Sequence, residues 1–392
     1  MSETSQNFKM VAKTFFGFEN ILAEELRILG AGNVQIGVRN VSFEGDKGFM
    51  YKANLCCRTA IKILKPIAEF RVMNEDDLYR RMQRINWRKY MDVNTTFAIN
   101  ATVSGPTFTH SQYISFKTKD AIVDKFRREE NVRPNVDTKH PDLRLNVHIQ
   151  DNWCTLSLDS SGASLHHRGY RTATNIAPIN EALAAGLIMM SGWYGQSDFL
   201  DPMCGSGTMC IEAAMIACNV PANLNRKEFA FEKWGDWDVD LFELIEASAL
   251  KRVKDFRYTI TGYDKAPSAV EKARENVKNA QLSDFVTIRE ENFFKTEKEG
   301  NDFLHIVFNP PYGERLPIEM EEFYKEIGDT LKSRYPGSHA WMITSNMESL
   351  KHVGLRPSRK IKCFNGSLES RLVKYEMYEG SKKGKYLDRE EE

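Results

Sequence analysis

The chain has 392 residues, 42% of them hydrophobic, and its 54 Lys and Arg residues balance 54 Asp and Glu residues. This length predicts two or three domains with sizeable cores. Residues 1–170 carry 24 basic against 19 acidic side chains, an excess that favours an anionic partner such as RNA but also fits ordinary surface variation.

Membrane and metal-binding classes do not fit this composition. No run of about 18 apolar residues is present and residues 1–9 are polar, so the sequence predicts neither a membrane span nor a signal peptide. We therefore expect a cytoplasmic location. The seven cysteines show no Cys-x-x-Cys pair and no zinc-like spacing with histidine, which predicts free thiols and no metal site. The oligomeric state stays open.

Residues 1–67 form the first predicted domain. Patterning and turn residues predict a strand at 9–14, a helix at 18–29, strands at 34–38 and 41–44, a helix at 47–58 and a strand at 60–66. This β-α-β-β-α-β order is that of the ferredoxin-like unit, which carries no chemistry of its own.

Residues 68–165 form the second predicted domain, with a helix at 75–85, a strand at 96–103, a helix at 113–129, and strands at 143–150 and 153–159. The block precedes a nucleotide fold and resembles the THUMP domain, a module of RNA-modifying enzymes. It is rich in basic residues: Arg80, Arg81, Arg84, Arg88, Lys89, Lys117, Lys119, Lys125, Arg127 and Arg128. These could bind phosphates with little sequence preference, or simply form solvated helix faces balanced by nearby acids.

A connecting segment at 162–174 leads into the third predicted domain, residues 166–380. Its two adjacent histidines predict no metal site, because neighbouring side chains seldom converge on one ion. Arg168 and Arg171 are predicted to contact RNA or an adjoining domain. A helix at 181–190 follows.

A glycine-rich loop, Gly205-Ser206-Gly207, follows a short strand and precedes a helix. Glycine lets the backbone turn sharply and approach a ligand at the helix N-terminus, as at a nucleoside site. Asp201, just ahead of the loop, suits a cationic ligand better than a pyrophosphate, and Cys210 replaces the third glycine of the dinucleotide fingerprint. S-adenosylmethionine, with an ammonium, a sulfonium and no phosphate, therefore fits better than a nicotinamide cofactor.

A second acid, Asp264, ends a predicted strand at 258–264, where nucleotide folds hold ribose hydroxyls. It lies 63 residues after Asp201, whereas roughly 20 residues are usual between glycine loop and acid. The chain therefore contains an insertion, placed at 219–240 and followed by a helix at 241–254. Such an element either contributes to substrate binding or is a surface element without a role at the site.

The predicted reactive turn is Asn309-Pro310-Pro311-Tyr312, after the apolar run 303–308, which is typical of a central parallel strand. The two prolines stiffen the turn and leave its carbonyl groups free. The Asn309 amide oxygen and the Pro310 carbonyl could accept both hydrogens of a planar amino group, and Tyr312 offers a stacking face. The turn therefore suits an exocyclic amine of a nucleobase; the alternative is an ordinary proline-rich turn.

The remaining elements complete an α/β fold: a helix at 266–280, strands at 285–289 and 340–344, a helix at 320–331, and a final hairpin with strands at 360–364 and 371–378. Residues 381–392 are charged, lack apolar anchors and are predicted to be disordered.

These motifs resemble those of class I S-adenosylmethionine-dependent methyltransferases. Residues 201–208 are similar to motif I, residues 309–312 to motif IV of the amino-group methyltransferases, and residues 177–180 occupy the place of motif X. The resemblance implies a Rossmann-like domain with a mostly parallel seven-stranded sheet. It implies catalytic Asn309, Pro310 and Tyr312, substrate-binding Pro311, Arg168 and Arg171, and cofactor-binding Asp201, Gly205, Ser206, Gly207, Asp264 and Asn292, the last at a position where the family commonly has Asp.

The whole chain resembles the bacterial 23S ribosomal RNA guanine-N(2) methyltransferases in the order of its domains and in the segments 309–315 and 365–371. This resemblance implies methylation of the 2-amino group of a guanine in large-subunit ribosomal RNA. Open alternatives are a tRNA guanine-N(2) methyltransferase, an adenine-N(6) methyltransferase on RNA or DNA, and a non-catalytic RNA-binding assembly factor.

Overall fold

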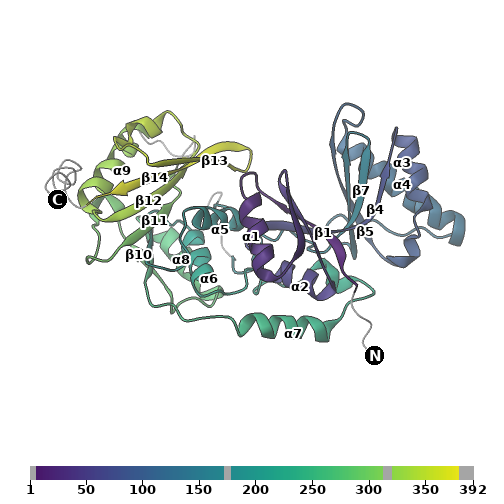
Figure 1. The fold of residues 1–392 in the computed structure, drawn as a ribbon, viewed down its shortest axis with the longest axis horizontal. Helices are drawn as coiled ribbons and strands as arrows, with labels where there is room; N and C mark the ends of the chain where they lie inside the picture. The colour runs from purple at the N-terminus through teal and green to yellow at the C-terminus, as the bar shows by residue number, and fades with distance from the viewer. Residues whose placement is uncertain (1–5, 172–177, 312–319, 379–392) are drawn as a thin grey trace. The chain divides into compact units, whose positions relative to one another are not determined.

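The computed structural model describes residues 6–171, 178–311 and 320–378, which form two units (Figure 1). The first unit comprises Met1–Thr14, Leu22–Leu165 and Arg226–Ala247, and the second comprises Phe15–Ile21, His166–Asn225 and Ser248–Glu392. Each unit is built around a seven-stranded sheet. Among the described residues, no helix is both long and apolar enough to cross a membrane. The tail at 381–392, predicted to be disordered, lies outside the described residues.

The first half of the chain begins with the predicted ferredoxin-like order. Its elements are β1 (Phe8–Thr14), α1 (Glu19–Leu29), β2 (Gly32–Gly37), β3 (Asn40–Gly45), α2 (Lys47–Cys56) and β4 (Ala60–Arg71). Gly30, at a φ of 106°, ends α1, and the Asp46 side chain caps α2 by accepting from the Phe49 N–H. The predicted β-α-β-β-α-β order is confirmed.

The elements that follow share the same sheet. They are α3 (Glu75–Arg84), β5 (Phe97–Ser104), α4 (Ser111–Glu130), β6 (Leu143–Gln150) and β7 (Trp153–Asp159), and the strand order is β2-β3-β1-β4-β7-β6-β5. Strand β4 continues past its predicted end at Pro66. It pairs with β1 from Ala60 to Leu64 and with β7 from Leu64 to Arg71, with a bulge between Pro66 and Ala68. The predicted domain boundary between residues 67 and 68 therefore falls inside a shared strand.

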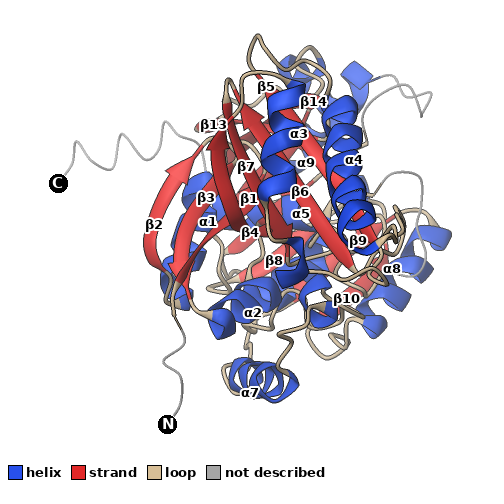
Figure 2. Cartoon of the chain, turned by 90° about the vertical axis from the view of Figure 1, so that its right-hand side faces the viewer, coloured by secondary structure: helices blue, strands red, loops and turns tan. Residues whose placement is uncertain are grey.

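The helices α1 to α4 pack on one face of this sheet. Alternate strand residues such as Met10, Ile63, Leu145 and Leu156 are fully buried and form one core with side chains of these helices. Figure 2 shows α3 and α4 lying across the strands of the second half of the sheet. The intervening strand residues face the other side.

The predicted insertion at 219–240 lies partly in the first unit, which the chain enters again at Arg226. The ring of Phe231 lies 4.5 Å from that of Tyr51 on α2, and the ring of Trp237 lies 5.2 Å from it. Both belong to the apolar core of the first unit or pack against it. This part of the insertion therefore stabilises the first unit, a role that the sequence did not suggest.

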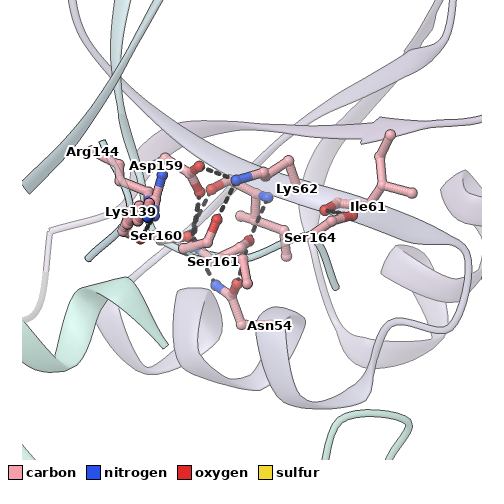
Figure 3. A network of polar contacts seen from close by, with 12 residues as sticks. Asn54, Ile61, Lys62, Lys139, Arg144, Asp159, Ser160, Ser161 and Ser164 are labelled. Carbon is pink, nitrogen blue, oxygen red and sulfur yellow. Dashed lines mark hydrogen bonds and ion pairs between the residues drawn. The ribbon is translucent and has the colours of Figure 1, made fainter. Parts of the chain in front are cut away.

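A polar network holds the segment that follows β7 (Figure 3). Asp159 accepts from the Lys62 ammonium and from the Ser161 N–H, and Asn54 donates to Ser160 and accepts from Ser161. The Arg226 guanidinium donates to the carbonyl groups of residues 161, 163 and 164. The insertion and the end of β7 are thus bonded to each other.

The second unit contains the predicted nucleotide fold. Its elements are α5 (Glu181–Met190), β8 (Asp198–Asp201), α6 (Thr208–Ala217), β9 (Ile260–Asp264), α8 (Pro267–Asn279), β10 (Val286–Glu290), β11 (Leu304–Phe308), α9 (Met320–Arg334), β12 (Ser338–Thr344), β13 (Arg359–Asn365) and β14 (Leu368–Met377). A further helix, α7, spans Val239–Leu250 and lies mostly in the first unit. Short 3-10 turns that were not predicted lie at Trp87–Lys89 and Ala230–Lys233 in the first unit, and at Phe293–Lys295 and Ser349–Val353 in the second.

The second sheet has the order β10-β9-β8-β11-β12-β14-β13. Pairs from β10 to β12 are parallel, and β14 is antiparallel to both of its neighbours, which confirms the predicted mostly parallel sheet and final hairpin. The chain order reverses between β8 and β11. Open α/β sheets bind ligands at the carboxyl ends of strands beside such a reversal.

Replacing Gly328 by Ala is expected to destabilise the second unit by about 1–3 kcal/mol. A Cβ atom at this position of α9 would lie 1.7 Å from the Val353 carbonyl oxygen, and backbone cannot move aside easily. Urea unfolding followed by circular dichroism measures the loss. Gly235→Ala, where nothing lies within 4 Å of the added atom, is the control. Equal stability of the two variants would mean that α9 and the 349–353 turn do not pack this closely.

Candidate active site

A cavity of about 490 Å³ lies at the carboxyl ends of the central strands of the second sheet. The predicted site residues that line it are Asp201, Gly205, Ser206, Asp264, Asn292, Asn309 and Pro311. Gly207 and Pro310 are not among the lining residues, and Pro310 is buried. Tyr312 lies outside the described residues. The fold thus brings the glycine loop, both acids and the start of the reactive turn to one hollow.

The glycine loop is held by the second acid. Asp264 accepts from the Gly205 N–H through one carboxylate oxygen at 3.0 Å and from the Ala266 N–H through the other at 2.9 Å. Gly205 and Gly207 adopt φ values of 53° and 82°, which favour glycine. An ionised carboxylate has about four acceptor sites, so Asp264 retains capacity for the two hydroxyls of a ribose.

Asp201 is a buried carboxyl that no described basic side chain pairs with. It accepts from the Met203 N–H at 3.1 Å. Burial, and to a lesser extent the nearby Asp264 charge, raises the pKa of Asp201 to about 8. A buried acid facing a cavity favours a cationic ligand, since the ligand's charge stabilises the carboxylate. An ammonium or sulfonium group fits this position.

Asn309 presents an acceptor that lacks a donor. Its side-chain oxygen Oδ1 is buried at the cavity and has no hydrogen-bond partner among the described residues. An unsatisfied buried acceptor costs free energy unless a ligand supplies the donor. Pro311 lines the cavity beside it. The position fits an N–H group of a ligand, as the sequence predicted.

Aromatic residues that sequence reasoning did not assign to the site complete one wall. Asn292 accepts from the Phe294 N–H at 3.1 Å, and its oxygen retains a second lone pair. Phe293, Phe294 and Phe323 line the cavity, and the Phe294 and Phe323 rings meet edge-to-face at 5.5 Å. The sequence could have indicated Phe293 and Phe294 as site residues, because they directly follow Asn292. It could not indicate Phe323, which reaches the cavity from α9, far along the chain.

Arg168 was predicted to contact RNA or an adjoining domain, and its burial excludes contact with RNA. The side chain is fully buried, and its guanidinium pairs with Glu212 on α6, with 3.3 Å from Nε to Oε1 and 3.3 Å from Nη2 to Oε2. The Tyr170 hydroxyl donates to the same carboxylate at 3.3 Å. A charge in this position cannot reach a phosphate, so Arg168 is a structural residue of the second unit.

Arg171 lies against the glycine loop. It pairs with Glu181 at 3.0 Å, and donates to the Thr208 hydroxyl at 2.8 Å and the Ser206 hydroxyl at 3.4 Å. A fourth bond reaches the Ile179 carbonyl at 3.3 Å. The side chain therefore fastens the loop to the segment that precedes α5 and is little exposed to an RNA.

Among the described residues, no group of three or more His, Cys, Asp or Glu side chains could hold a metal ion. The cavity's acceptors and acids instead match a cationic organic ligand with hydroxyl and amine donors.

Replacing Glu212 by Gln is expected to destabilise the second unit by about 3–5 kcal/mol, because it leaves the Arg168 charge buried and unpaired. Arg289→Ala, which removes an exposed ion pair with Glu299 in the same unit, is the control and should cost about 0–1 kcal/mol. Urea unfolding measures both. Similar losses would mean that Arg168 is not held in a buried pair.

Family models match three successive stretches of the chain. They are the RlmL ferredoxin-like domain over residues 9–64, the THUMP domain over residues 72–159, and the RMKL-like methyltransferase domain over residues 168–374. The third match covers more than half of the chain.

Two relatives and one solved structure are similar over nearly the whole chain. A presumed RNA methyltransferase of Synechocystis sp., slr0064, is 36% identical over 96% of this chain and 97% of its own. The ribosomal RNA large subunit methyltransferase K/L of Syntrophotalea carbinolica is 36% identical over 93% of this chain, which spans only 53% of that relative's length. The crystal structure of SMU.472, a presumed methyltransferase complexed with S-adenosylhomocysteine, has a TM-score of 0.85 and 29% identity, over 96% of this chain and 100% of its own.

The glycine loop, the two acids, Asn309 and Pro311 meet at one cavity, and the family model matches residues 168–374. The chain therefore belongs to the RMKL-like methyltransferases, a family that uses S-adenosylmethionine as its methyl donor.

Proposed function

We propose that this protein methylates RNA, at the exocyclic 2-amino group of a guanine in large-subunit ribosomal RNA. The observation that carries the proposal is the Asn309 Oδ1 atom, a buried acceptor at the cavity without a donor among the described residues. An exocyclic amine supplies the missing N–H. The relatives named as RNA and ribosomal RNA methyltransferases support the nucleic-acid class, and the THUMP match supports RNA.

The residues around the cavity fit S-adenosylmethionine, which supplies an electrophilic methyl group on a sulfonium when bound. Asp264 would accept the ribose hydroxyls, Asn292 the adenine amine, and Asp201 would face the cationic methionine end. Gly205 and Ser206 would bring backbone close to this ligand, and Gly207 would let the chain turn into α6. Arg171 holds the loop in place through its bonds to Ser206 and Thr208.

Methyl transfer then depends on how the guanine amine is positioned, and it requires no nucleophile from the protein. Asn309 and the Pro310 carbonyl would each accept one hydrogen of the guanine amine, which aims the nitrogen lone pair and stabilises the positive charge that grows on it. Pro311 and Tyr312 would hold the base. A base reaches such a pocket only after leaving its stack, which costs least in a loop or single strand.

Asn309→Ala is expected to lower kcat for RNA methylation by about 10²–10³-fold, the usual effect of removing one such electrostatic contact. The affinity for S-adenosylmethionine should stay nearly unchanged. Tritium transfer to ribosomal RNA and to tRNA from a strain lacking the gene, followed by mass spectrometry of nucleosides, measures the rate and identifies the product. Asn301→Ala, at an exposed asparagine of the same unit, is the control.

The product decides among the substrate classes. The proposal expects 2-methylguanosine in large-subunit ribosomal RNA. Methyl transfer only to tRNA, or formation of N(6)-methyladenosine, would contradict it, and retention of full activity by Asn309→Ala would remove the assigned role of this side chain.

At pH values below about 8, binding of S-adenosylmethionine is expected to release the proton of the Asp201 carboxyl. Burial raises the pKa of Asp201 to about 8, so the carboxyl is mostly protonated at pH 6.5. A cationic ligand favours the carboxylate, so the proton must leave as the ligand binds, and the affinity falls as the pH falls. Titration calorimetry at pH 6.5 in buffers of different ionisation enthalpy measures the proton release.

Asp201→Asn carries no ionisable group at this position and should show no such release. An affinity of the unaltered protein that is the same at pH 6 and pH 8, or proton release that persists in the Asn variant, would show that Asp201 does not face the cation.

A further inference from the structure

The first unit has a sheet face on which none of its described helices packs. The helices α1 to α4 form their core with the opposite face, as the buried residues Met10, Leu145 and Leu156 show. Residues that alternate with that core point the other way and carry uncharged polar side chains in β5, β6 and β7, namely Asn100, Thr102, Asn146, His148, Gln150 and Thr155. We call this surface the polar sheet face.

Two side chains at one end of the polar sheet face are suited to a nucleic acid. Arg71 on β4 and Trp153 on β7 are paired directly across the sheet, so their side chains lie next to each other on this face. Trp153 is 46% exposed, which is unusual for an indole without a ligand. Arg71 is exposed and forms no ion pair with any described residue.

Some of the other charges on the polar sheet face are paired. Glu69, next to Arg71 on the same face, is paired with Lys9 at 3.2 Å, and Asp159 is bound by Lys62. Lys13 on β1 is half-buried, and burial together with the charge of Arg39 lowers its pKa. Even so, basic side chains on this face outnumber acidic ones: they are Lys9, Lys13, Lys62, Arg71 and Arg144 against Glu44, Glu69 and Asp159.

The helix-covered side also carries many basic residues. Six of the ten basic residues that stand out in the sequence of this region are in ion pairs there: Arg80 and Arg81 with Asp77, Arg88 with Glu130, Lys117 with Asp76, Lys119 with Asp120, and Lys125 with Glu129. Arg84, Lys89, Arg127 and Arg128 are in no ion pair with a described residue, so the helix side also keeps unpaired basic side chains. What sets the sheet side apart is the exposed indole of Trp153 directly beside Arg71.

We infer that the polar sheet face binds the substrate RNA, with a base stacked on Trp153 and a phosphate bound by Arg71. The inference rests on the proposed function for its ligand. Open sheet faces bearing aromatic side chains are an established platform for single-stranded RNA, and amide, hydroxyl and imidazole groups suit ribose hydroxyls and base edges. A protein partner would require an apolar interface core, which this row of polar side chains does not provide.

Fluorescence anisotropy with a labelled single-stranded 16-nucleotide oligouridine, and with ribosomal RNA, tests the inference on the full chain. Trp153→Ala should weaken binding about tenfold or more, and Trp153→Phe should restore most of it. Arg71→Ala should weaken binding and reduce the slope of log affinity against log salt by about 0.7. The matched controls on the helix side are Phe116→Ala, at an aromatic ring 53% exposed on α4, and Arg80→Ala on α3.

Both controls should stay within about twofold of the unaltered protein, and S-adenosylmethionine affinity should be unchanged in all five variants. Full RNA affinity in Trp153→Ala and Arg71→Ala, together with normal methylation of RNA by the unaltered protein, would overturn this inference and leave the proposed function intact. Equal losses in the helix-side controls would also overturn it. An unaltered protein that neither binds nor methylates RNA would remove the proposed function and this inference with it.

Discussion

The active-site architecture depends on one carboxylate. Asp264 bonds the N–H groups of Gly205 and Ala266, so it ties the turn after β8 to the turn after β9. Two further contacts hold the same loop: the Asn276 side chain donates to the Ser206 carbonyl at 3.0 Å, and Arg171 bonds the Ser206 and Thr208 hydroxyls. A loop fixed from several directions presents its backbone to a ligand in a single conformation, which lowers the entropy cost of binding.

Two polar groups at the cavity are buried in a way that lowers the stability of the fold. Asp201 is buried without a cation, and the oxygen of Asn309 is buried without a donor among the described residues. In a core that served only stability, such groups would be paired or replaced by apolar ones. A cationic ligand beside Asp201 and an N–H donor beside Asn309 would recover this free energy. The paired Arg168 and Glu212 in the same unit show the opposite, fully compensated arrangement.

The first unit is one structural body assembled from segments that are distant in the sequence. Strand β4 pairs with β1 on one side and β7 on the other, which joins the ferredoxin-like and THUMP parts into one sheet. The segment Arg226–Ala247 adds Phe231 and Trp237 to the packing around Tyr51. The helices α1 to α4 pack on one side of this sheet, and the other side exposes the polar sheet face.

The sequence by itself determined the types and order of the elements, because hydrophobic periodicity and glycine and proline positions are local properties of the chain. It also located the glycine loop, Asp264 and the Asn309 turn, since each combines an unusual local composition with a strand end. The burial of Arg168, the return of residues 226–247 to the first unit and the position of Phe323 in the cavity were decided only by the tertiary structure. Each depends on a partner far along the chain, such as Glu212 for Arg168, and a charged or aromatic residue carries no local sign of whether such a partner will bury it.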